Sequence, residues 1–262
     1  MRGIALACAL VLAAAHAAAG PRAPQERFGR VVIDAGHGGD DHGARGPAGL
    51  LEKDLVLDLA RRLAKKLRAE GVEVQLTRDA DAFVALDART QAANAAGADL
   101  FVSIHANASR AKNVRGIETF FASPEASDET AQELALAENA AFGPGAAKLA
   151  QGDPLLAILG DLLATEQLAD SQEFARIAQR ELARSAQRRS RGVKQAPFVV
   201  LMGVRMPAVL VEVGFITNRE DERALRKPSE RERIAAALAR AVAAFRARQD
   251  ERSGVAGAGG KR

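Results

Sequence analysis

Apolar runs alternate with helix-like segments along most of this chain, and this alternation limits the folds that it can adopt. Strands are expected at residues 30–35, 72–77 and 98–108, where apolar residues are continuous or alternate with polar ones. Between them, a leucine at every fourth position predicts an amphipathic helix over 52–70, and a second helix is expected over 86–97, ending at a glycine. This order and spacing predict an α/β fold with a mostly parallel, twisted sheet and helices on both faces.

The second half of the chain returns to this framework after an interruption. Residues 116–121 and 207–218 are expected to form strands, and a helix over roughly 229–248 completes the fold. The intervening residues are rich in Ala, Glu and Gln and predict helices near 127–141, 154–166 and 171–187. We therefore expect a helical insertion, at about residues 124–170, in the α/β framework.

The first twenty residues, MRGIALACALVLAAAHAAAG, have the pattern of a secretory signal peptide. A basic Arg2 precedes an apolar run, and small residues at Ala17 and Ala19 predict cleavage after Ala19. A lipoprotein leader modified at Cys8 is the alternative, although few residues precede this cysteine. The expected organisation is a signal peptide at 1–19, a lead-in at 20–29, a folded domain at 30–248 and a disordered tail at 249–262.

Composition narrows the class of protein further. With 262 residues the chain can form one large domain with its own core, and ten Phe without any Trp or Tyr favour helices packed on a sheet over an aromatic-rich β-sandwich. The formal net charge is +4, and the basic run at 188–191 is interpreted as a solvated helix face. No nucleic-acid-binding motif is present, so no nucleic-acid partner is expected. We expect a monomer without a transmembrane segment in the mature chain.

Two histidines follow two of the expected strands directly. His37 and His105 both come after a strand end, which is where ligands gather in parallel sheets. A histidine in this place can be a core residue, a general base or a metal ligand. Together with Glu52, the two imidazoles would form a tripod that leaves one position of a tetrahedral Zn²⁺ open for water. Glu212 lies in a strand so apolar that its charge needs a partner, and it is the candidate general base.

The sequence around these residues is more specific than their spacing. The segments DAGHGG, LEKD, LTR, SIHANA, RGVKQAPFVVL and PAVLVEVGFITN follow one another in this order. This succession resembles the zinc-dependent N-acetylmuramoyl-L-alanine amidases of bacterial cell walls, and most closely the periplasmic cell-separation type with a helical insertion. The resemblance extends over about residues 30–248, which would then be a zinc amidase catalytic domain.

The resemblance implies a role for each candidate residue. His37, Glu52 and His105 would bind one Zn²⁺, and Glu212 would be the catalytic glutamate. Two departures from the family pattern, at Ala35 and in the loop position of His42, are small. A separate N-terminal wall-targeting domain, which many relatives carry, is expected to be missing, so the route to the division septum is left open.

The implied reaction is hydrolysis of the amide bond between N-acetylmuramic acid and the L-alanine of the stem peptide. The substrate would be peptidoglycan, the compartment the periplasm, and the process cell-wall remodelling and daughter-cell separation. Two alternatives remain open at this stage. The chain could be a catalytically silent peptidoglycan-binding protein, or a zinc peptidase that acts within the stem peptide.

The insertion carries a further expectation. By resemblance, one of its helices would cross the cleft and place a glutamate on the zinc, with Glu138 as the first candidate and Glu133 as the second. A shielding helical hairpin is the simpler alternative. A periplasmic activator of the LytM type would bind the apolar face of the next helix and pull the lid away. That face consists of Leu155, Leu156, Ile158, Leu159, Leu162 and Leu163.

Three other polar residues have two interpretations each. His42 lies in a Gly- and Asp-containing loop and is interpreted as solvated rather than as a ligand. Arg89 would either hold a substrate carboxylate or form an ion pair between its helix and a loop. Asn107 would either orient a ligand or the substrate, or cap the turn after its strand.

Overall fold

The computed structural model describes residues 27–140, 165–186 and 188–254. Six strands form one sheet with the order β2-β1-β3-β6-β4-β5. The strands are β1 (Arg30–Ala35), β2 (Glu73–Leu76), β3 (Leu100–Asn107), β4 (Ile117–Ala122), β5 (Ser190–Ala196) and β6 (Ala208–Phe215). The first three strands and β6 are parallel, whereas β4 is antiparallel to β6 and β5 is parallel to β4. The predicted mostly parallel sheet is therefore confirmed.

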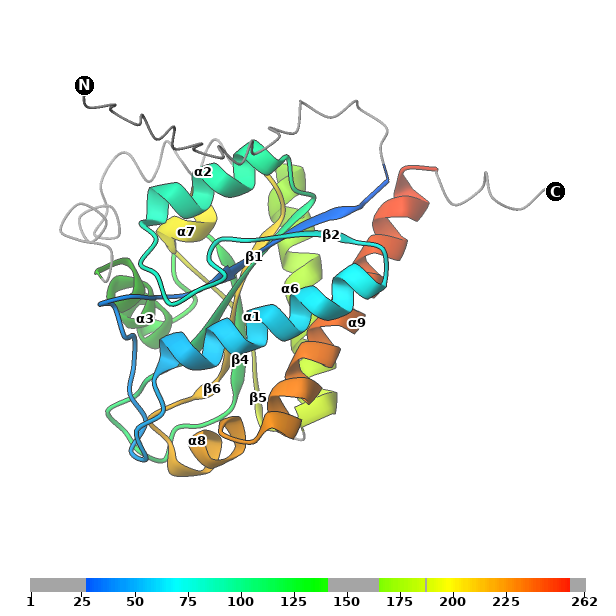
Figure 1. The fold of residues 1–262 in the computed structure, drawn as a ribbon. Coiled ribbons are helices and arrows are strands. Elements are labelled where there is room, and N and C mark those ends of the chain that lie inside the picture. The colour runs from blue at the N-terminus through cyan, green and yellow to red at the C-terminus, as the bar shows by residue number, and fades with distance from the viewer. Residues whose placement is uncertain (1–26, 141–164, 187, 255–262) are drawn as a thin grey trace, which may run out of the picture.

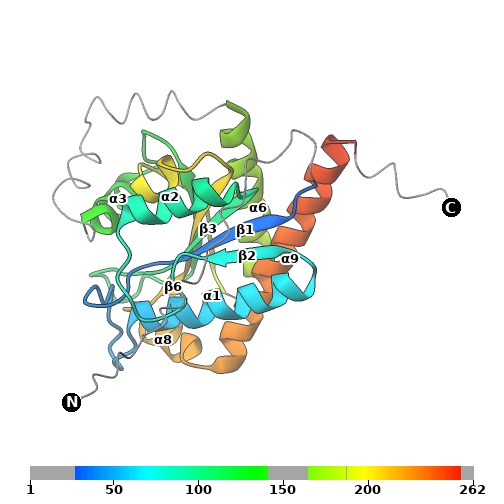
Figure 2. The ribbon, with the colours of Figure 1, turned by 45° about the horizontal axis from the view of Figure 1, so that its top comes forward.

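Helices cover both faces of this sheet (Figures 1 and 2). One face packs against α1 (Glu52–Ala69), α6 (Thr165–Ala186) and α9 (Pro228–Arg252), and the other against α2 (Leu86–Ala96), α3 (Glu129–Ala140) and the short α7 (Val199–Met202). A further short helix, α8 (Arg219–Leu225), follows β6. The four leucines that predicted α1 are fully buried, which explains why this helix docks on the sheet.

Alternate residues of each strand point to opposite faces of the sheet. Odd-numbered Val31, Ile33 and Ala35 of β1 belong to the core under α1 and α9, whereas Val32 belongs to the core under α2. His105 in β3 pairs with Glu212 in β6, and by the same alternation both side chains point to the face covered by α2 and α3. That face carries the polar residues described below.

Several elements differ from the sequence-based expectation. The segment 188–191 was interpreted as a helix face, but Ser190 begins β5, the strand at one edge of the sheet. Helix α6 begins at Thr165 rather than at 171, and α9 continues to Arg252. The expected helix near 154–166 lies almost entirely outside the described residues. Within the described ranges, every helix is too short or too polar to cross a membrane.

Candidate metal centre and active-site cleft

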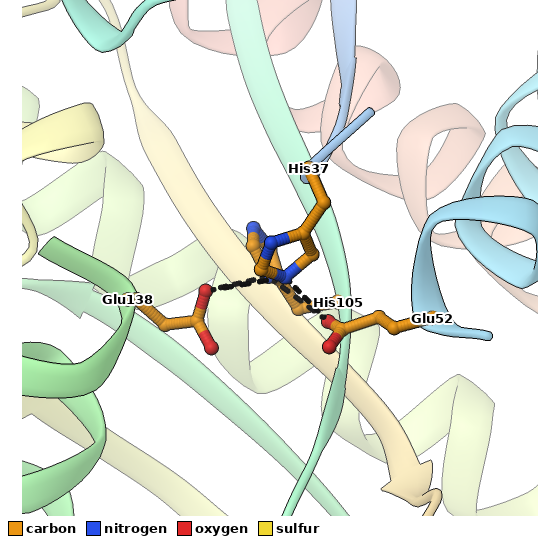
Figure 3. A group of neighbouring side chains, drawn as sticks. All are labelled: His37, Glu52, His105 and Glu138. Atoms are coloured by element: carbon orange, nitrogen blue, oxygen red, sulfur yellow. Dashed lines mark ion pairs between the residues drawn. The ribbon is translucent and has the colours of Figure 1, made fainter. Parts of the chain in front are cut away.

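Four side chains from four different elements converge where the central strands β1 and β3 end (Figure 3). His37 follows β1, Glu52 begins α1, His105 lies near the end of β3, and Glu138 lies in the last turn of α3. One ligand atom from each of the four lies within 4.8 Å of all the others. We call this group the metal cluster. The structure thus brings together all three residues predicted from the sequence to bind zinc, and the first-choice glutamate of the insertion as well.

The distances within the metal cluster are short enough for hydrogen bonds, but three of the inward-facing atoms do not make one in the described part of the chain. Glu52 Oε1 lies 3.1 Å from His37 Nε2 and 3.2 Å from His105 Nδ1. Glu138 Oε2 lies 3.5 Å and 3.1 Å from the same two nitrogens. Yet His37 Nε2, His105 Nδ1 and Glu138 Oε2 are buried and make no hydrogen bond with a described residue. Buried polar atoms that point at one another without bonding are a recognised feature of a site for an ion.

The backbone around the cluster is shaped for close approach. His37 is the one non-glycine residue with a positive φ, 59°, among those described. Gly36 stands directly against the imidazole of His105, where a Cβ atom would collide with the ring. A Cβ on Gly43 would collide with His37 and Glu52 in the same way. The glycine-rich loop after β1 therefore lets the two histidines and the glutamate meet.

Atoms on the outer side of the cluster are held by ordinary hydrogen bonds. His37 Nδ1 lies 2.9 Å from Asp41 Oδ2, and this contact orients the ring so that Nε2 faces the centre. Glu52 accepts a hydrogen bond from the Ala106 backbone N–H at 2.9 Å and another from the Ala44 N–H at 2.9 Å. These bonds fix the ligand atoms before any ion binds, which reduces the entropy lost on binding.

The charged members of the metal cluster shift one another's pKa values. Burial alone lowers the pKa of His37, but the charges of Glu52 and Glu138 and the hydrogen bond to Asp41 outweigh it and raise this pKa to about 10. Burial likewise opposes protonation of His105, and Glu138 and Glu52 raise its pKa well above the usual value. For Glu52, burial favours the neutral acid, but the two histidines lower its pKa. A bound divalent cation would take the place of the protons on the two imidazoles and offset the negative charge beside them.

Glu212 lies next to the cluster on the same face of the sheet but has a different environment. It pairs in register with His105 on one side and with Glu118 on the other. Its side chain has no exposed surface, and neither carboxylate oxygen has a hydrogen-bond partner among the described residues. Burial raises the pKa of Glu212 well above its usual value; the positive charge of His105 opposes this shift, and nearby carboxylates add to it. A carboxyl group of this kind holds a proton more readily than a solvated one.

Directly behind the cluster, on the same face, lies a second buried polar group, the Asp34 network. Arg89 is fully buried, and its Nη1 donates to Asp34 Oδ1 at 2.7 Å and to the Ala35 carbonyl at 2.7 Å. Its Nη2 donates to the His37 carbonyl at 2.9 Å. Arg78 adds bonds to the carbonyls of Ala35 and Gly36. Arg89 thus forms an ion pair, but with Asp34 of strand β1 rather than with a loop, and its bond to the His37 carbonyl fixes the backbone that carries His37.

The cluster opens into a cleft with a volume of about 820 Å³. Its floor includes His37 and Glu52, and one wall is the face of α3 that carries Glu138. Glu133, the second-choice glutamate, also lines the cleft but is exposed and does not belong to the metal cluster. His42 is exposed, as expected. The six apolar residues predicted to bind an activator, from Leu155 to Leu163, lie outside the described residues.

Sequence reasoning missed some residues that shape the cleft. Glu118 and Arg191 line it at the starts of β4 and β5, where their ion pair has a distance of 2.7 Å. Asn107 also lines the cleft and donates from Nδ2 to Glu118 at 3.1 Å, a partner that the sequence did not indicate. The segment RGVKQAPFVVL, which contains Arg191, was recognised as a motif, but its strand was not, and the partner of Arg191 therefore remained hidden.

A mostly parallel α/β sheet with a buried His/Glu/His/Glu cluster in an open cleft is typical of metal-dependent hydrolases. Residues 31–244 match the family model described as N-acetylmuramoyl-L-alanine amidase. The chain belongs to this family. As such it is an enzyme that hydrolyses the amide bond between N-acetylmuramic acid and L-alanine, as the sequence motifs predicted.

Individual relatives agree with this assignment. The chain is 38% identical to the N-acetylmuramoyl-L-alanine amidase AmiA of Escherichia coli (strain K12) over 217 residues, which are 82% of this chain and 75% of that protein. It is 34% identical to AmiC of Neisseria meningitidis serogroup B, covering 85% of this chain and 54% of the relative. Among solved structures, an amidase from Clostridium difficile 630 superposes with a TM-score of 0.66 at 27% identity, covering 84% of this chain and 97% of that one. AmiC2 of Nostoc punctiforme gives 0.61 at 32% identity, with 83% and 97% covered.

Proposed function

We propose that this amidase uses Zn²⁺ held by His37, Glu52 and His105, and that α3 keeps the free enzyme inhibited. The observation that carries the proposal is the convergence of four ligand atoms within 4.8 Å, three of them buried without a hydrogen bond. Two imidazoles and one carboxylate are a common ligand set of catalytic zinc, which keeps its fourth position for water. The residues present therefore fit the ion.

The chain's own groups have distinct tasks in this mechanism. When bound, zinc polarises the amide carbonyl and lowers the pKa of a water molecule toward ~7. Glu212 accepts a proton from the attacking water at its carboxylate and returns it to the nitrogen of the leaving L-alanine. Because Glu212 is buried, a proton that it accepts passes to the leaving nitrogen rather than to bulk water. Asp41 keeps His37 in the orientation that presents Nε2.

The inhibition is supported by the position of Glu138. Its Oε2 lies 3.1 Å from His105 Nδ1, on the side of the cluster that a water molecule and the substrate need. The neighbouring Asn139 ties the end of α3 to the segment after β5, donating to the Pro197 carbonyl at 2.8 Å and accepting from the Val199 N–H at 3.0 Å. With α3 in this place Glu212 has no exposed surface. In the proposed mechanism, displacement of α3 and of Glu138 is the step that admits water to the cluster.

We further propose a place of action and a partner. The leader-like residues 1–19 support export to the periplasm, where peptidoglycan lies. An activator of the LytM type would bind the apolar stretch from Leu155 to Leu163 and draw α3 out of the cleft, so that hydrolysis is confined to the site of daughter-cell separation.

Mass spectrometry of digested muropeptides, with metal content measured on the same protein sample, tests the proposal. The expected result is about one zinc per chain and release of intact stem peptides that begin with L-alanine. Shortened stems would identify a peptidase, and unchanged muropeptides with any metal content would identify a silent binding protein. Full activity of a sample without metal would overturn the role of zinc.

A further inference from the structure

Arg191, the second residue of β5, occupies one wall of the active-site cleft. Its Nε lies 2.7 Å from Glu118 Oε1, and its guanidinium carbon lies 5.2 Å from the centre of the Phe215 ring. The side chain is 24% exposed, so it is neither buried in the core nor free in solvent. Stacking on an aromatic face and one ion pair together hold the guanidinium in a single orientation.

The carboxylate that anchors Arg191 is itself fixed. Glu118 has a side-chain exposure of 3% and receives Lys194 Nζ at 2.9 Å as well as Asn107 Nδ2 at 3.1 Å. Lys194 Nζ also lies 3.2 Å from Asp128 Oδ2, so Arg191 and Lys194 together face two carboxylates. The buried Glu118 holds Arg191 through Nε alone and fixes the direction of the rest of its guanidinium.

The free end of this arginine faces the cleft. Within the described part of the chain, only Nε of Arg191 makes a hydrogen bond or ion pair, and both terminal nitrogens, Nη1 and Nη2, have no such contact. Their parallel N–H groups match the two oxygens of a carboxylate. An arginine held by stacking and by Nε, with its terminal nitrogens unused in a substrate cleft, is organised to bind an anion.

The distance to the metal cluster indicates which part of a substrate reaches Arg191. Phe215 pairs with Asn107, two residues past His105 and one strand over, so it lies roughly 8 Å from His105 by strand spacing and rise. An extended peptide covers about 7 Å in two residues. If the reacting amide is at the cluster, the second residue of the leaving stem peptide lies beside Arg191. That residue is a D-glutamate linked through its side-chain carboxyl group, which leaves its α-carboxylate free unless it is amidated.

We propose that Arg191 binds the free α-carboxylate of the second stem-peptide residue and makes the enzyme selective for stems in which this group is not amidated. The inference rests on the proposed position of the scissile amide at the metal cluster. Arg191 is then a residue that determines substrate specificity, and the group that it recognises is the α-carboxylate. Lysine in place of Arg191 would keep the charge but not the two parallel donors.

The test compares two muropeptides that differ only in amidation of this carboxylate. For the zinc-loaded parent, kcat/KM is expected to be about ten- to a hundredfold higher for the free carboxylate, the effect of one charge-assisted, two-point contact. Arg191→Gln should lose this preference, mainly through a higher KM for the free acid. Arg191→Lys should keep part of the preference. Arg115→Gln, an exposed arginine outside the cleft lining, is the matched control and should discriminate like the parent.

Calorimetric titration of the metal-free protein with the two free stem peptides separates this inference from the proposed function. The parent should bind the acid more tightly than the amide, and Arg191→Gln should bind both alike. Equal affinities in the parent, or an unchanged preference in Arg191→Gln, would overturn the role of Arg191. If Arg191→Gln does not fold, Arg191→Lys is measured instead. Full retention of the preference for the acid in Arg191→Lys would contradict the two-donor contact. If the parent binds the acid more tightly than the amide but releases no stem peptides, the proposed function is rejected while the carboxylate-binding role of Arg191 is retained.

Discussion

The metal cluster and the Asp34 network are two buried polar groups only three residues apart along the chain, at Asp34 and His37, but they differ in how their atoms are paired. In the Asp34 network, Asp34 accepts from Arg89, from Thr77 at 2.6 Å and from Ser103 at 2.8 Å. In the metal cluster, the inward-facing atoms of three residues have no hydrogen bond among the described residues. Complete pairing is typical of a structural support, whereas buried unpaired ligand atoms indicate a group that is supplied from outside.

The largest expected effect comes from removing one member of the unpaired cluster. His105→Ala should abolish both zinc retention and hydrolysis, because the remaining groups no longer surround the ion. In the parent, chelation of zinc should lower Tm, since an ion that binds the folded state stabilises it. In His105→Ala, the same chelation should leave Tm unchanged.

Metal analysis, muropeptide digestion and thermal unfolding of one preparation check this expectation. His42→Ala, in the exposed loop beside the cluster, is the matched control and should behave like the parent. Stoichiometric zinc in active His105→Ala protein would show that the cluster is not the metal site.

The next largest effect separates the ligands from the general base. Glu212→Gln should keep one zinc per chain but lose roughly 10²–10⁴-fold in kcat, because the amide has the same shape but cannot accept a proton. The measurement is kcat on a soluble muropeptide together with metal content. Near-normal turnover would exclude Glu212 from the mechanism, and loss of metal would make it a ligand instead.

Breaking the paired network should affect stability rather than metal binding. Asp34→Asn removes the carboxylate that pairs with the buried Arg89, and breaking such a buried ion pair costs about 3–5 kcal/mol. The free energy of unfolding in urea, measured on the metal-free protein, should fall by that amount. Asp58→Asn is a control from the surface. Asp58 is 31% exposed and pairs with Arg62 and Arg231, so its loss should change stability by less than about 1 kcal/mol.

The same variant gives a pH test. Burial opposes ionisation of Asp34, but Arg89 and the hydroxyls of Thr77 and Ser103 outweigh it and hold its pKa below the usual 3.8. A lowered pKa contributes stability that is present above the unfolded-state value and is lost as the pH falls through the folded-state value. The parent should therefore lose this contribution only in acid below pH 3.8, and Asp34→Asn should lack that part of the acid dependence. An identical acid profile for both proteins would contradict the assignment.

The smallest expected effect concerns Glu138, the member of the metal cluster that lies on α3. Glu138→Ala removes the one ligand atom that belongs to the insertion, and basal hydrolysis without an activator should rise. Each ~1.4 kcal/mol by which the closed state is preferred corresponds to a tenfold increase. Initial rates on purified muropeptides, with zinc content measured alongside, give the answer. Glu129→Ala, exposed in the first turn of the same helix, should leave the rate unchanged. A folded, zinc-loaded Glu138→Ala enzyme no faster than the parent would exclude a lid.

Sequence patterns predicted the parts of the fold that have strong periodicity. The leucine spacing of α1 and the apolar runs of β1, β3 and β6 lie within a few residues of their predicted bounds. Edge strand β5 was missed because its residues, SRGVKQA, are half-exposed and polar, and an edge strand has no continuous apolar pattern to reveal it. Helices α7 and α8 are too short to show a period.

The candidate site was predictable to the extent that it follows strand ends. His37 and His105 lie at the carboxyl ends of parallel strands, and this rule made them candidates. Glu118 and Arg191 lie instead at the beginnings of β4 and β5. These strands run in the opposite direction to β6 and its parallel partners, so their beginnings lie beside the ends of the other strands. That reversal is a tertiary property, so sequence alone gave no reason to place these two residues in the cleft.

The four members of the metal cluster come from positions 37, 52, 105 and 138, each on a different element. No two of them are near neighbours in the chain, so the unfolded polypeptide has no ready-made chelating pair. An ion then has little affinity for the unfolded chain, and almost all of its binding free energy favours the folded state. It also follows that the sheet must assemble before the ion can be captured, because the ligands meet only through long-range contacts. We therefore expect the metal-free protein to fold first and the proposed zinc ion to bind last.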